Sequence, residues 1–241
     1  MGKNWKICAL ALITALSLPW AGLVLSRSPA ESVDAPAEIT QAPVIALTFD
    51  DGPRRSTTTQ LLDGLAERGV KATFFLIGEQ VPGNEDLVER MDAEGHQIGI
   101  HTYQHVRLTE LNTADFASQV DRTAALLRQL VDREGFALRP PYGMVDNGVK
   151  KRAGTPIILW SIDPEDWNDK NTERIVEHVV SRASDGDIIL LHDIYSSSVE
   201  AALKIVDALH EKGFLFATVD ELALQHHVAL TAGEVYRNFY P

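Results

Sequence analysis

Short apolar runs alternate with amphipathic stretches between residues 44 and 225. The apolar runs are rich in Val, Ile, Leu and Phe, a composition typical of strands that are buried on both faces. They predict strands at residues 44–49, 72–77, 97–100, 136–138, 157–162, 187–191 and 214–217. Apolar residues at helical spacing, closed in several places by a glycine, predict helices at residues 57–68, 84–94, 113–132, 171–183 and 199–212.

A last helix is expected after residue 218, because Thr218 and Glu221 form a capping box. Strands that alternate with helices are typical of parallel βα units, so we expect an α/β sheet or barrel. The hydrophobic share of 45% and the charged share of 23% are those of a globular protein. We therefore expect one domain at residues 43–225, followed by a C-terminal tail at residues 226–241.

The first 25 residues predict export from the cytoplasm. Lys3 and Lys6 precede a run from Ile7 to Leu25, in which 15 of 19 residues are apolar. A positive segment followed by an apolar one is typical of a signal peptide, and 19 residues are also just enough for a membrane anchor. Residues 26–42, rich in Ser, Pro and Ala, predict a flexible linker. Both alternatives place the domain outside the cytoplasm, either secreted or tethered to the outer face of the cytoplasmic membrane.

Charge and cysteine content narrow the function. The chain has a net charge of −12, and without its first thirty residues it has 19 basic and 34 acidic residues, a net charge of −15. Phosphates would repel such a domain, which disfavours nucleic acid as a partner. The single cysteine, Cys8, lies in the apolar leader, so the domain has no disulfide and no thiolate ligand. Any metal must be bound by histidines and carboxylates.

Five polar clusters each follow a predicted strand directly. In parallel α/β folds the carboxyl ends of the strands open on one face, where ligands bind, so we expect the clusters to converge there. They lie at residues 50–53 (DDGP), 101–105 (HTYQH), 139–143 (RPPYG), 163–167 (DPEDW) and 192–193 (HD).

The histidines of the second cluster are candidate metal ligands. His101 and His105 are four residues apart, so on a helical turn both imidazoles face the same side. With Asp51 they form a set of two histidines and one carboxylate, which suits a catalytic Zn²⁺ with water in the remaining position. Fe²⁺ uses similar ligands in oxygenases. Asp50 and Asp51 also suit a simple turn, although neighbouring carboxylates repel each other unless a cation or hydrogen bonds compensate them.

The other clusters allow two interpretations each. Arg139, which precedes two prolines, is either an oriented guanidinium that fixes a carboxylate or a structural surface arginine. Asp163 and Asp166 are ordinary loop acids unless they serve the site. His192, at the end of an apolar run, is either a buried core histidine or a functional one.

Together these clusters resemble the polysaccharide deacetylases, also called the NodB-homology family or carbohydrate esterase family four. The resemblance rests on TFDDGP at residues 48–53, then HTYQH, RPPYG and DPEDW, and finally LLH at residues 190–192. Ile100 departs from the family, where a polar residue often precedes the first histidine, and so does Val106-Arg107, where a proline often follows the second. The resemblance implies a distorted (β/α) barrel with fewer than eight strands.

The resemblance implies that Asp51, His101 and His105 bind a divalent metal ion, with Zn²⁺ as the first choice and Co²⁺ or another divalent ion as alternatives. The ion would lower the pKa of its water and polarise the acetyl carbonyl. Asp50 would be the general base, held in place by Arg139.

The resemblance also assigns the leaving-group side of the site. His192 would be the general acid that protonates the leaving amine, and Asp166 would orient it. The backbone N–H of Tyr142 would help to stabilise the oxyanion. Trp167 and Leu190 would line the pocket for the acetyl methyl group.

The implied activity is N-deacetylation of N-acetylglucosamine units in a cell-wall polysaccharide, with peptidoglycan as the leading substrate. The alternatives are a chitin-oligosaccharide deacetylase and an acetylxylan esterase. A different class, an inactive sugar-binding module, is disfavoured because the base, the acid and all three metal ligands are present. We expect a monomer that acts on a polysaccharide, does not bind nucleic acid, and attaches to the membrane, if at all, through its N-terminal segment.

Overall fold

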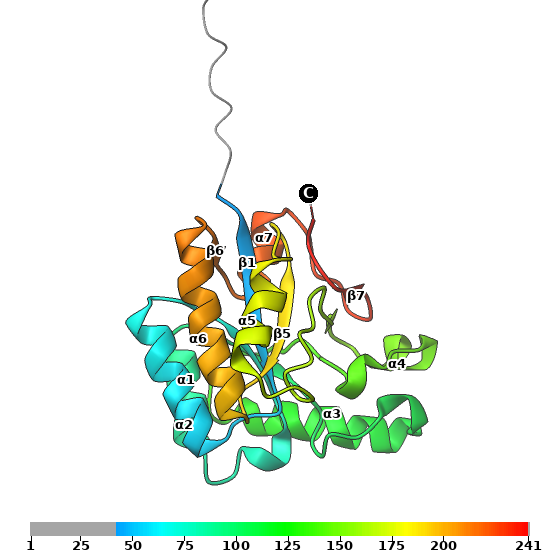
Figure 1. The fold of residues 1–241 in the computed structure, drawn as a ribbon. Coiled ribbons are helices and arrows are strands. Elements are labelled where there is room, and N and C mark those ends of the chain that lie inside the picture. Colours follow the sequence, from blue (N-terminus) through cyan, green and yellow to red (C-terminus); the bar gives the residue numbers. More distant parts are fainter. Residues whose placement is uncertain (1–41, 241) are drawn as a thin grey trace, which may run out of the picture. The chain divides into compact units, whose positions relative to one another are not determined.

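The computed structural model describes residues 42–240, and its centre is a parallel β-sheet (Figure 1). Strand β1 (Val44–Asp50) lies between β2 (Thr73–Leu76) and β5 (Ile188–His192), and β3 (Gln97–Ile100) lies beyond β2. The short β6 (Leu215–Phe216) pairs with the start of β1. Every pairing in this sheet is parallel, which confirms the predicted α/β class.

Isolated bridges extend the sheet at both edges toward a barrel-like closure. Leu138 bridges Ile100 of β3 on one side and Ile157 on the other, where β4 (Ile157–Ile158) begins. The same chain segment then reaches the opposite edge of the sheet, because Ile162 bridges Ile189 of β5. The described residues contain seven strands, which agrees with the expected number below eight.

Burial of β1 explains its sequence. All seven of its residues are buried, including the polar Thr48 and Asp50, because the sheet is covered on both faces. Helices α5 and α6 cover one face in Figure 1. The helices are α1 (Arg55–Glu67), α2 (Glu85–Ala93), α3 (Thr113–Leu127), α4 (Asn147–Arg152), α5 (Thr172–Val180), α6 (Ser196–Glu211) and α7 (Val219–Gln225).

Most predicted elements exist, with shifted ends. Helix α3 ends at Leu127 rather than at residue 132, and the predicted strand at residues 136–138 is reduced to the bridge at Leu138. The capping box of Thr218 and Glu221 is present at the start of α7. The sequence did not predict α4, whose six residues include a glycine and only one buried apolar side chain, Val149.

The segment predicted as a C-terminal tail packs against the domain. Strand β7 (Val235–Tyr236) pairs in parallel with β4. Phe239 is buried, and its backbone N–H donates to the carbonyl of Gly186 at 2.8 Å. A two-residue strand and a single buried aromatic ring leave no periodic pattern in the sequence.

The expected signal peptide or anchor at residues 1–25 lies outside the described residues, and so does the linker at residues 26–42 apart from its last residue. Within residues 42–240, none of the helices combines the length and the apolar character that a membrane span requires.

Candidate active site

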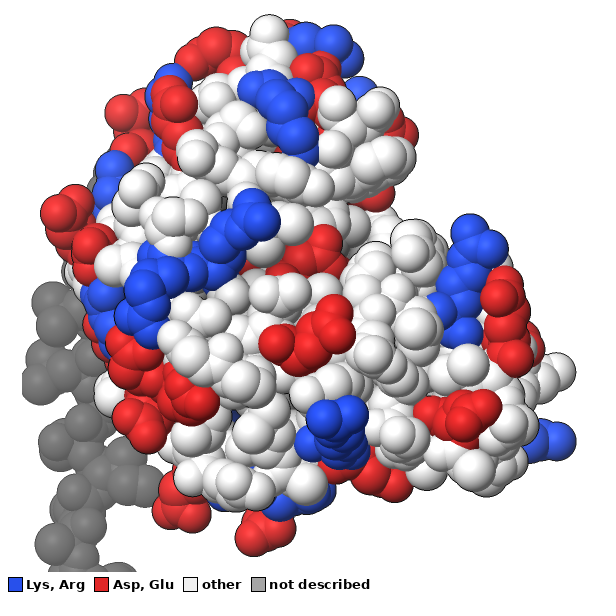
Figure 2. All heavy atoms as spheres, turned by 90° about the horizontal axis from the view of Figure 1, so that it is seen from below, with Lys and Arg blue, Asp and Glu red and all other residues white. Residues whose placement is uncertain are grey.

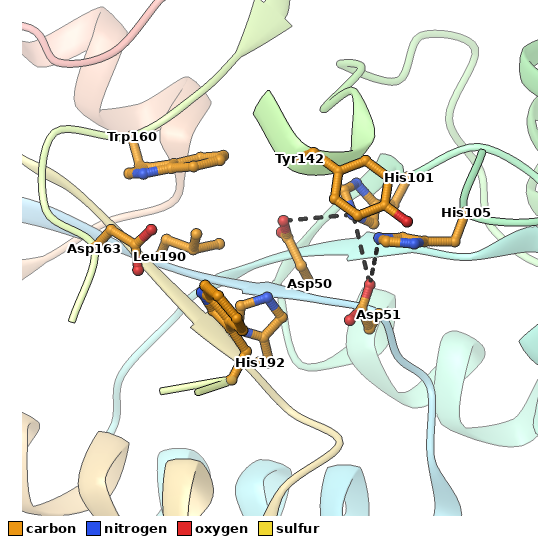
Figure 3. Close-up of a pocket in the computed structure, with 10 residues that line it drawn as sticks. Asp50, Asp51, His101, His105, Tyr142, Trp160, Asp163, Leu190 and His192 are labelled. Carbon is orange, nitrogen blue, oxygen red and sulfur yellow. Dashed lines mark ion pairs between the residues drawn. The ribbon is translucent and has the colours of Figure 1, made fainter. Parts of the chain in front are cut away.

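The carboxyl ends of β1 and β5 border a pocket of about 350 Å³ (Figure 3). Its position follows from the strand register, which pairs Asp50 at the end of β1 with His192 at the end of β5. All five polar clusters contribute to the lining. The lining residues are Asp50, Asp51, His101, His105, Tyr142, Trp160, Asp163, Trp167, Leu190 and His192.

Asp50 is held by a buried arginine. Nη1 of Arg139 donates to Oδ1 of Asp50 at 2.8 Å and to the hydroxyl of Thr48 at 2.7 Å. The other guanidinium nitrogens donate to the carbonyls of Ile158 and Leu159 at 3.1 and 3.0 Å. Burial lowers the pKa of the Arg139 guanidinium, and the charge of Asp50 opposes this. Arg139 is therefore an oriented guanidinium and not a surface residue, and its contacts fix the Asp50 carboxylate.

Asp51, His101 and His105 form a compact cluster at the same edge. Oδ1 of Asp51 lies 3.5 Å from Nε2 of His101 and 3.3 Å from Nε2 of His105, and one potential ligand atom of each residue lies within 4.8 Å of the others. Oδ1 of Asp51 is buried without a hydrogen-bond partner. A buried carboxylate oxygen beside two imidazoles fits a divalent cation, which would compensate it.

The protonation of both imidazoles suits metal binding. Nδ1 of His101 lies 2.7 Å from the backbone carbonyl of Arg139, and because a carbonyl can only accept, Nδ1 carries the proton. This leaves the lone pair of Nε2 toward Asp51, as in histidine ligands oriented by a carbonyl. Burial and the neighbouring His101 lower the pKa of His105, which favours its neutral, ligating form.

The expectation that His101 and His105 share a helical turn was wrong. His101 follows the last residue of β3, and residues 101–107 form a loop without helical structure. Thr102 and His105 have φ angles of 63° and 53°, in the left-handed region. These two residues turn the chain back, so that the imidazoles converge by loop geometry. Non-glycine residues give no sequence signal for this conformation.

His192 forms a second buried pair with Asp166. Its Nδ1 lies 2.7 Å from Oδ1 of Asp166, and its backbone N–H donates to Oδ2 at 2.8 Å. Burial lowers the pKa of His192, but the hydrogen bond and charge of Asp166, together with the charges of Asp50 and Asp51, raise it more, to about 9. His192 thus lines the pocket as an imidazolium at neutral pH (Figure 3). The backbone contact holds the Asp166 carboxylate in place beside the ring.

The other predicted site residues lie around the metal-ligand cluster and the Asp166–His192 pair. Tyr142 is exposed, has a φ angle of 62°, and its ring stands edge-on to His105 at 4.9 Å between centroids. Trp167 is exposed at the rim, and Leu190 is buried at the pocket wall. Trp160 also lines the pocket, and no sequence signal indicated this, because Trp160 lies in the middle of the strand predicted at residues 157–162.

Two further acids belong to the site region. Asp163 lines the pocket, and burial raises the pKa of its carboxyl. Asp193 is buried behind the DDGP loop, where the hydroxyl of Thr58 donates to it and its other oxygen has no partner. Burial raises the pKa of Asp193 to about 7. Its position after His192 was noted in the sequence, but nothing there indicated burial.

The face of the domain at this end carries both charge signs, often side by side, with uncharged surface between these groups (Figure 2). It shows no broad field of positive charge such as phosphate backbones require.

Comparison with known proteins shows which family this chain belongs to. The sequence profile described as "Polysaccharide deacetylase" matches residues 37–155. A peptidoglycan-N-acetylglucosamine deacetylase of Bacillus cereus is 39% identical over 192 residues, and the match covers 76% of this chain and 90% of that protein. The chain belongs to the polysaccharide deacetylase family.

Two further comparisons agree with this membership of the polysaccharide deacetylases. The peptidoglycan-N-acetylmuramic acid deacetylase PdaC of Bacillus subtilis is 38% identical over 195 residues, covering 80% of this chain. The solved structure of PdaC superposes with a TM-score of 0.74 at 38% identity, and covers 76% of this chain and 91% of that one. The chain spans about two fifths of the length of the full-length PdaC sequence, with 42% covered.

Proposed function

We propose that this protein is a metal-dependent deacetylase that removes acetyl groups from N-acetylglucosamine units of a cell-wall polysaccharide, most directly peptidoglycan. The observation that carries the proposal is the joint placement of three groups in one pocket. These are the Asp51 cluster with its two histidines, the Asp50–Arg139 pair and the Asp166–His192 pair. The relatives named above act on N-acetylated sugars of peptidoglycan according to their names, which supports the same substrate class.

Asp51, His101 and His105 would hold the metal ion. Their fit rests on the unpartnered Oδ1 of Asp51 and on the lone pair that His101 presents at Nε2. Zn²⁺ is the first choice, with Co²⁺ or another divalent ion as alternatives. When bound, such an ion supplies a Lewis acid for the acetyl carbonyl and lowers the pKa of a water molecule.

Asp50 would take the proton of the attacking water. Its Oδ1 is engaged by Arg139, and its Oδ2 lies 3.7 Å from Nε2 of His101, at the metal cluster. Arg139 keeps its proton throughout, so the pairing leaves Asp50 as a pure acceptor. A base fixed at one oxygen and free at the other can accept a proton without moving.

His192 would give a proton to the leaving nitrogen. The hydroxyl of the water joins the acyl carbon, the C–N bond breaks, and the nitrogen leaves as an amine because it takes the proton from His192. Asp166 keeps the imidazole charged beforehand and orients it through Nδ1. The products are acetate and a sugar with a free amine.

The pocket walls would select the acetyl group. Trp167 and Leu190 would contact its methyl group, and the backbone N–H of Tyr142 would stabilise the oxyanion. We further propose that residues 1–25 export or anchor the chain, that residues 26–42 are a linker, and that residues 43–225 form the catalytic domain, against which the segment at residues 226–240 packs. The protein would act as a monomer outside the cytoplasm.

The proposed function is tested by acetate release from peptidoglycan, chitin oligomers and acetylxylan by the purified full chain. We expect release from peptidoglycan that disappears with a chelator and returns when Zn²⁺ or Co²⁺ is added. Faster release from chitin oligomers or acetylxylan would redirect the substrate assignment. Polysaccharide binding without acetate release, unaffected by the chelator, would contradict the enzyme assignment.

A further inference from the structure

Gln119, on helix α3, contacts the loop between the two clustered histidines. Its side-chain carbonyl accepts the backbone N–H of Tyr103 at 3.1 Å and that of Gln104 at 2.9 Å. Its amide nitrogen donates to Oε1 of Gln104 at 3.0 Å. One side chain from a distant helix therefore satisfies two successive N–H groups at the middle of the loop between His101 and His105.

This loop needs support because its backbone is unfavourable. Thr102 and His105 both have positive φ angles, a conformation that is unfavourable for a residue other than glycine. Such a conformation persists only where surrounding contacts determine it. Besides Gln119, the carbonyls of Thr102 and Tyr103 accept the N–H groups of Gly78 and Glu79 at 3.0 and 2.9 Å.

The two histidines are fixed in different ways. His101 is 3% exposed and lies directly after β3, with its ring held by the carbonyl of Arg139. His105 is 30% exposed at its side chain, and its ring contacts are with His101, Tyr142 and Asp51. The position of His105 therefore depends on the loop backbone, and the middle of this loop is held by Gln119.

We propose that Gln119 is a positioning residue for the metal site, which sets the place of His105 relative to Asp51 and His101. This inference rests on the proposed metal site of these three residues. Loss of the Gln119 acceptor leaves two N–H groups of the loop without their partner, and the left-handed residues can then relax. His105 would withdraw from the cluster, whereas His101 would stay. Groups that hydrogen-bond a metal ligand directly typically contribute 10- to 100-fold to metal affinity, and Gln119 acts one step further away, through the backbone of the loop.

The experiment compares variants of the full chain after removal of metal. Gln119→Leu has a similar size but no acceptor, and Gln119→Glu keeps an oxygen acceptor for both N–H groups. Gln129→Leu is the matched control, because Gln129 is an exposed glutamine just beyond the end of α3. The dissociation constant of Zn²⁺ is measured by competition with a chromophoric chelator, and the melting temperature of each metal-free variant is recorded beside it.

We expect Gln119→Leu to raise the Zn²⁺ dissociation constant about tenfold, the lower end of the range for direct partners of metal ligands. The Zn²⁺ dissociation constants of Gln119→Glu and Gln129→Leu should stay close to that of the protein without substitutions. In a His105→Ala background, Gln119→Leu should cause no further loss, because the ligand that it positions is already gone. A merely structural role would lower the metal-free melting temperature and weaken Zn²⁺ binding in that background as well.

An unchanged dissociation constant in Gln119→Leu would overturn the inference and leave the proposed metal site intact. Equal losses in Gln119→Leu and Gln119→Glu would overturn it too, because the acceptor would then not be the cause. If Gln119→Leu does not fold, Gln119→Asn, which shortens the reach of the amide by one methylene, takes its place with the same expected loss. If the protein without any substitution binds no Zn²⁺, both the proposed metal site and this inference are overturned.

Discussion

Replacing Asp166 by asparagine should separate amide hydrolysis from ester hydrolysis. The amide oxygen of asparagine can still accept a hydrogen bond from His192, but the negative charge is removed. In the unchanged protein, burial lowers the pKa of His192, and the hydrogen bond and charge of Asp166 raise it to about 9. With the charge of Asp166 gone, burial still lowers the pKa of His192 and the charges of Asp50 and Asp51 still raise it, so we expect this pKa to return close to 6.5.

The size of the effect follows from these two values. The difference between 9 and 6.5 corresponds to about 3 kcal/mol in favour of the protonated imidazole. At pH 8 the protonated fraction of His192 would fall from about 90% to about 3%, and at pH 6 it would remain above about half if the pKa is close to 6.5. Because an amine leaves only after protonation, amide hydrolysis should fall about 30-fold at pH 8 and much less at pH 6.

The assay is the pH dependence of kcat/KM on an N-acetylglucosamine oligomer and on an activated acetyl ester, with the same metal-loaded variant. The alkaline limb of the amide profile should move to lower pH by about 2.5 units, from about 9 to about 6.5. The ester should lose less, since its leaving group depends less on an acid. An alkaline limb that stays in place, or equal losses on both substrates at every pH, would refute the general-acid role of His192.

The same pair makes stability depend on pH. Because folding raises the pKa of His192 above its unfolded value of 6.5, the protonated pair stabilises the fold fully below about pH 6.5. This contribution declines as the pH rises through about 9. The melting temperature of the metal-free protein should therefore exceed that of Asp166→Asn by more at pH 6.5 than at pH 10. A difference that is the same at both pH values would contradict the linkage.

Three further variants test other parts of the site. His101→Ala should lose most Zn²⁺ affinity, because two remaining ligands hold the ion poorly, and a variant that purifies with one metal per chain would contradict the assigned ligands. Asp50→Asn should lower kcat about 10²–10⁴-fold and keep its metal, whereas loss of metal would exchange the roles of Asp50 and Asp51. Lys170→Met should lower amide hydrolysis about tenfold, since its ammonium donates to the carbonyls of Asp166 at 3.0 Å and Trp167 at 2.7 Å. Lys170→Arg should restore the rate, and an unaltered rate in Lys170→Met would show that the loop needs no such anchor.

The sequence predicted the strands and their polar ends because both depend on local composition. The apolar run at residues 44–49 followed by two acids corresponds to β1 and the start of the site. The convergence of distant clusters followed from one rule, that parallel strands end at one edge of the sheet. No single cluster was enough to predict a functional site, since each cluster also suited an ordinary turn, core or surface position.

The features that the sequence did not predict depend on contacts between distant residues. The loop at residues 101–107 carries a left-handed Thr102 and His105. Contacts of the intervening backbone with Gln119 and with the segment at Gly78 hold this loop, rather than local preference. Asp193 is an acid that becomes buried only because β5 places it behind the loop after β1. Helical spacing predicted the correct cluster of His101 and His105, although the backbone that creates it is not a helix.

The carboxyl ends of β1 and β5 also explain why Asp50 and Asp166, two acids of the same site, have different chemistry. Asp50 and His192 are register partners on β1 and β5, so they stand one strand spacing apart, about 4.8 Å. The partner of Asp50 is Arg139, which does not release its proton, so Asp50 can only accept one. The partner of Asp166 is His192, which does titrate, so this pair holds a proton that can be given away. A single sheet register thus places a proton acceptor beside a proton donor, and the identity of each buried partner determines which is which.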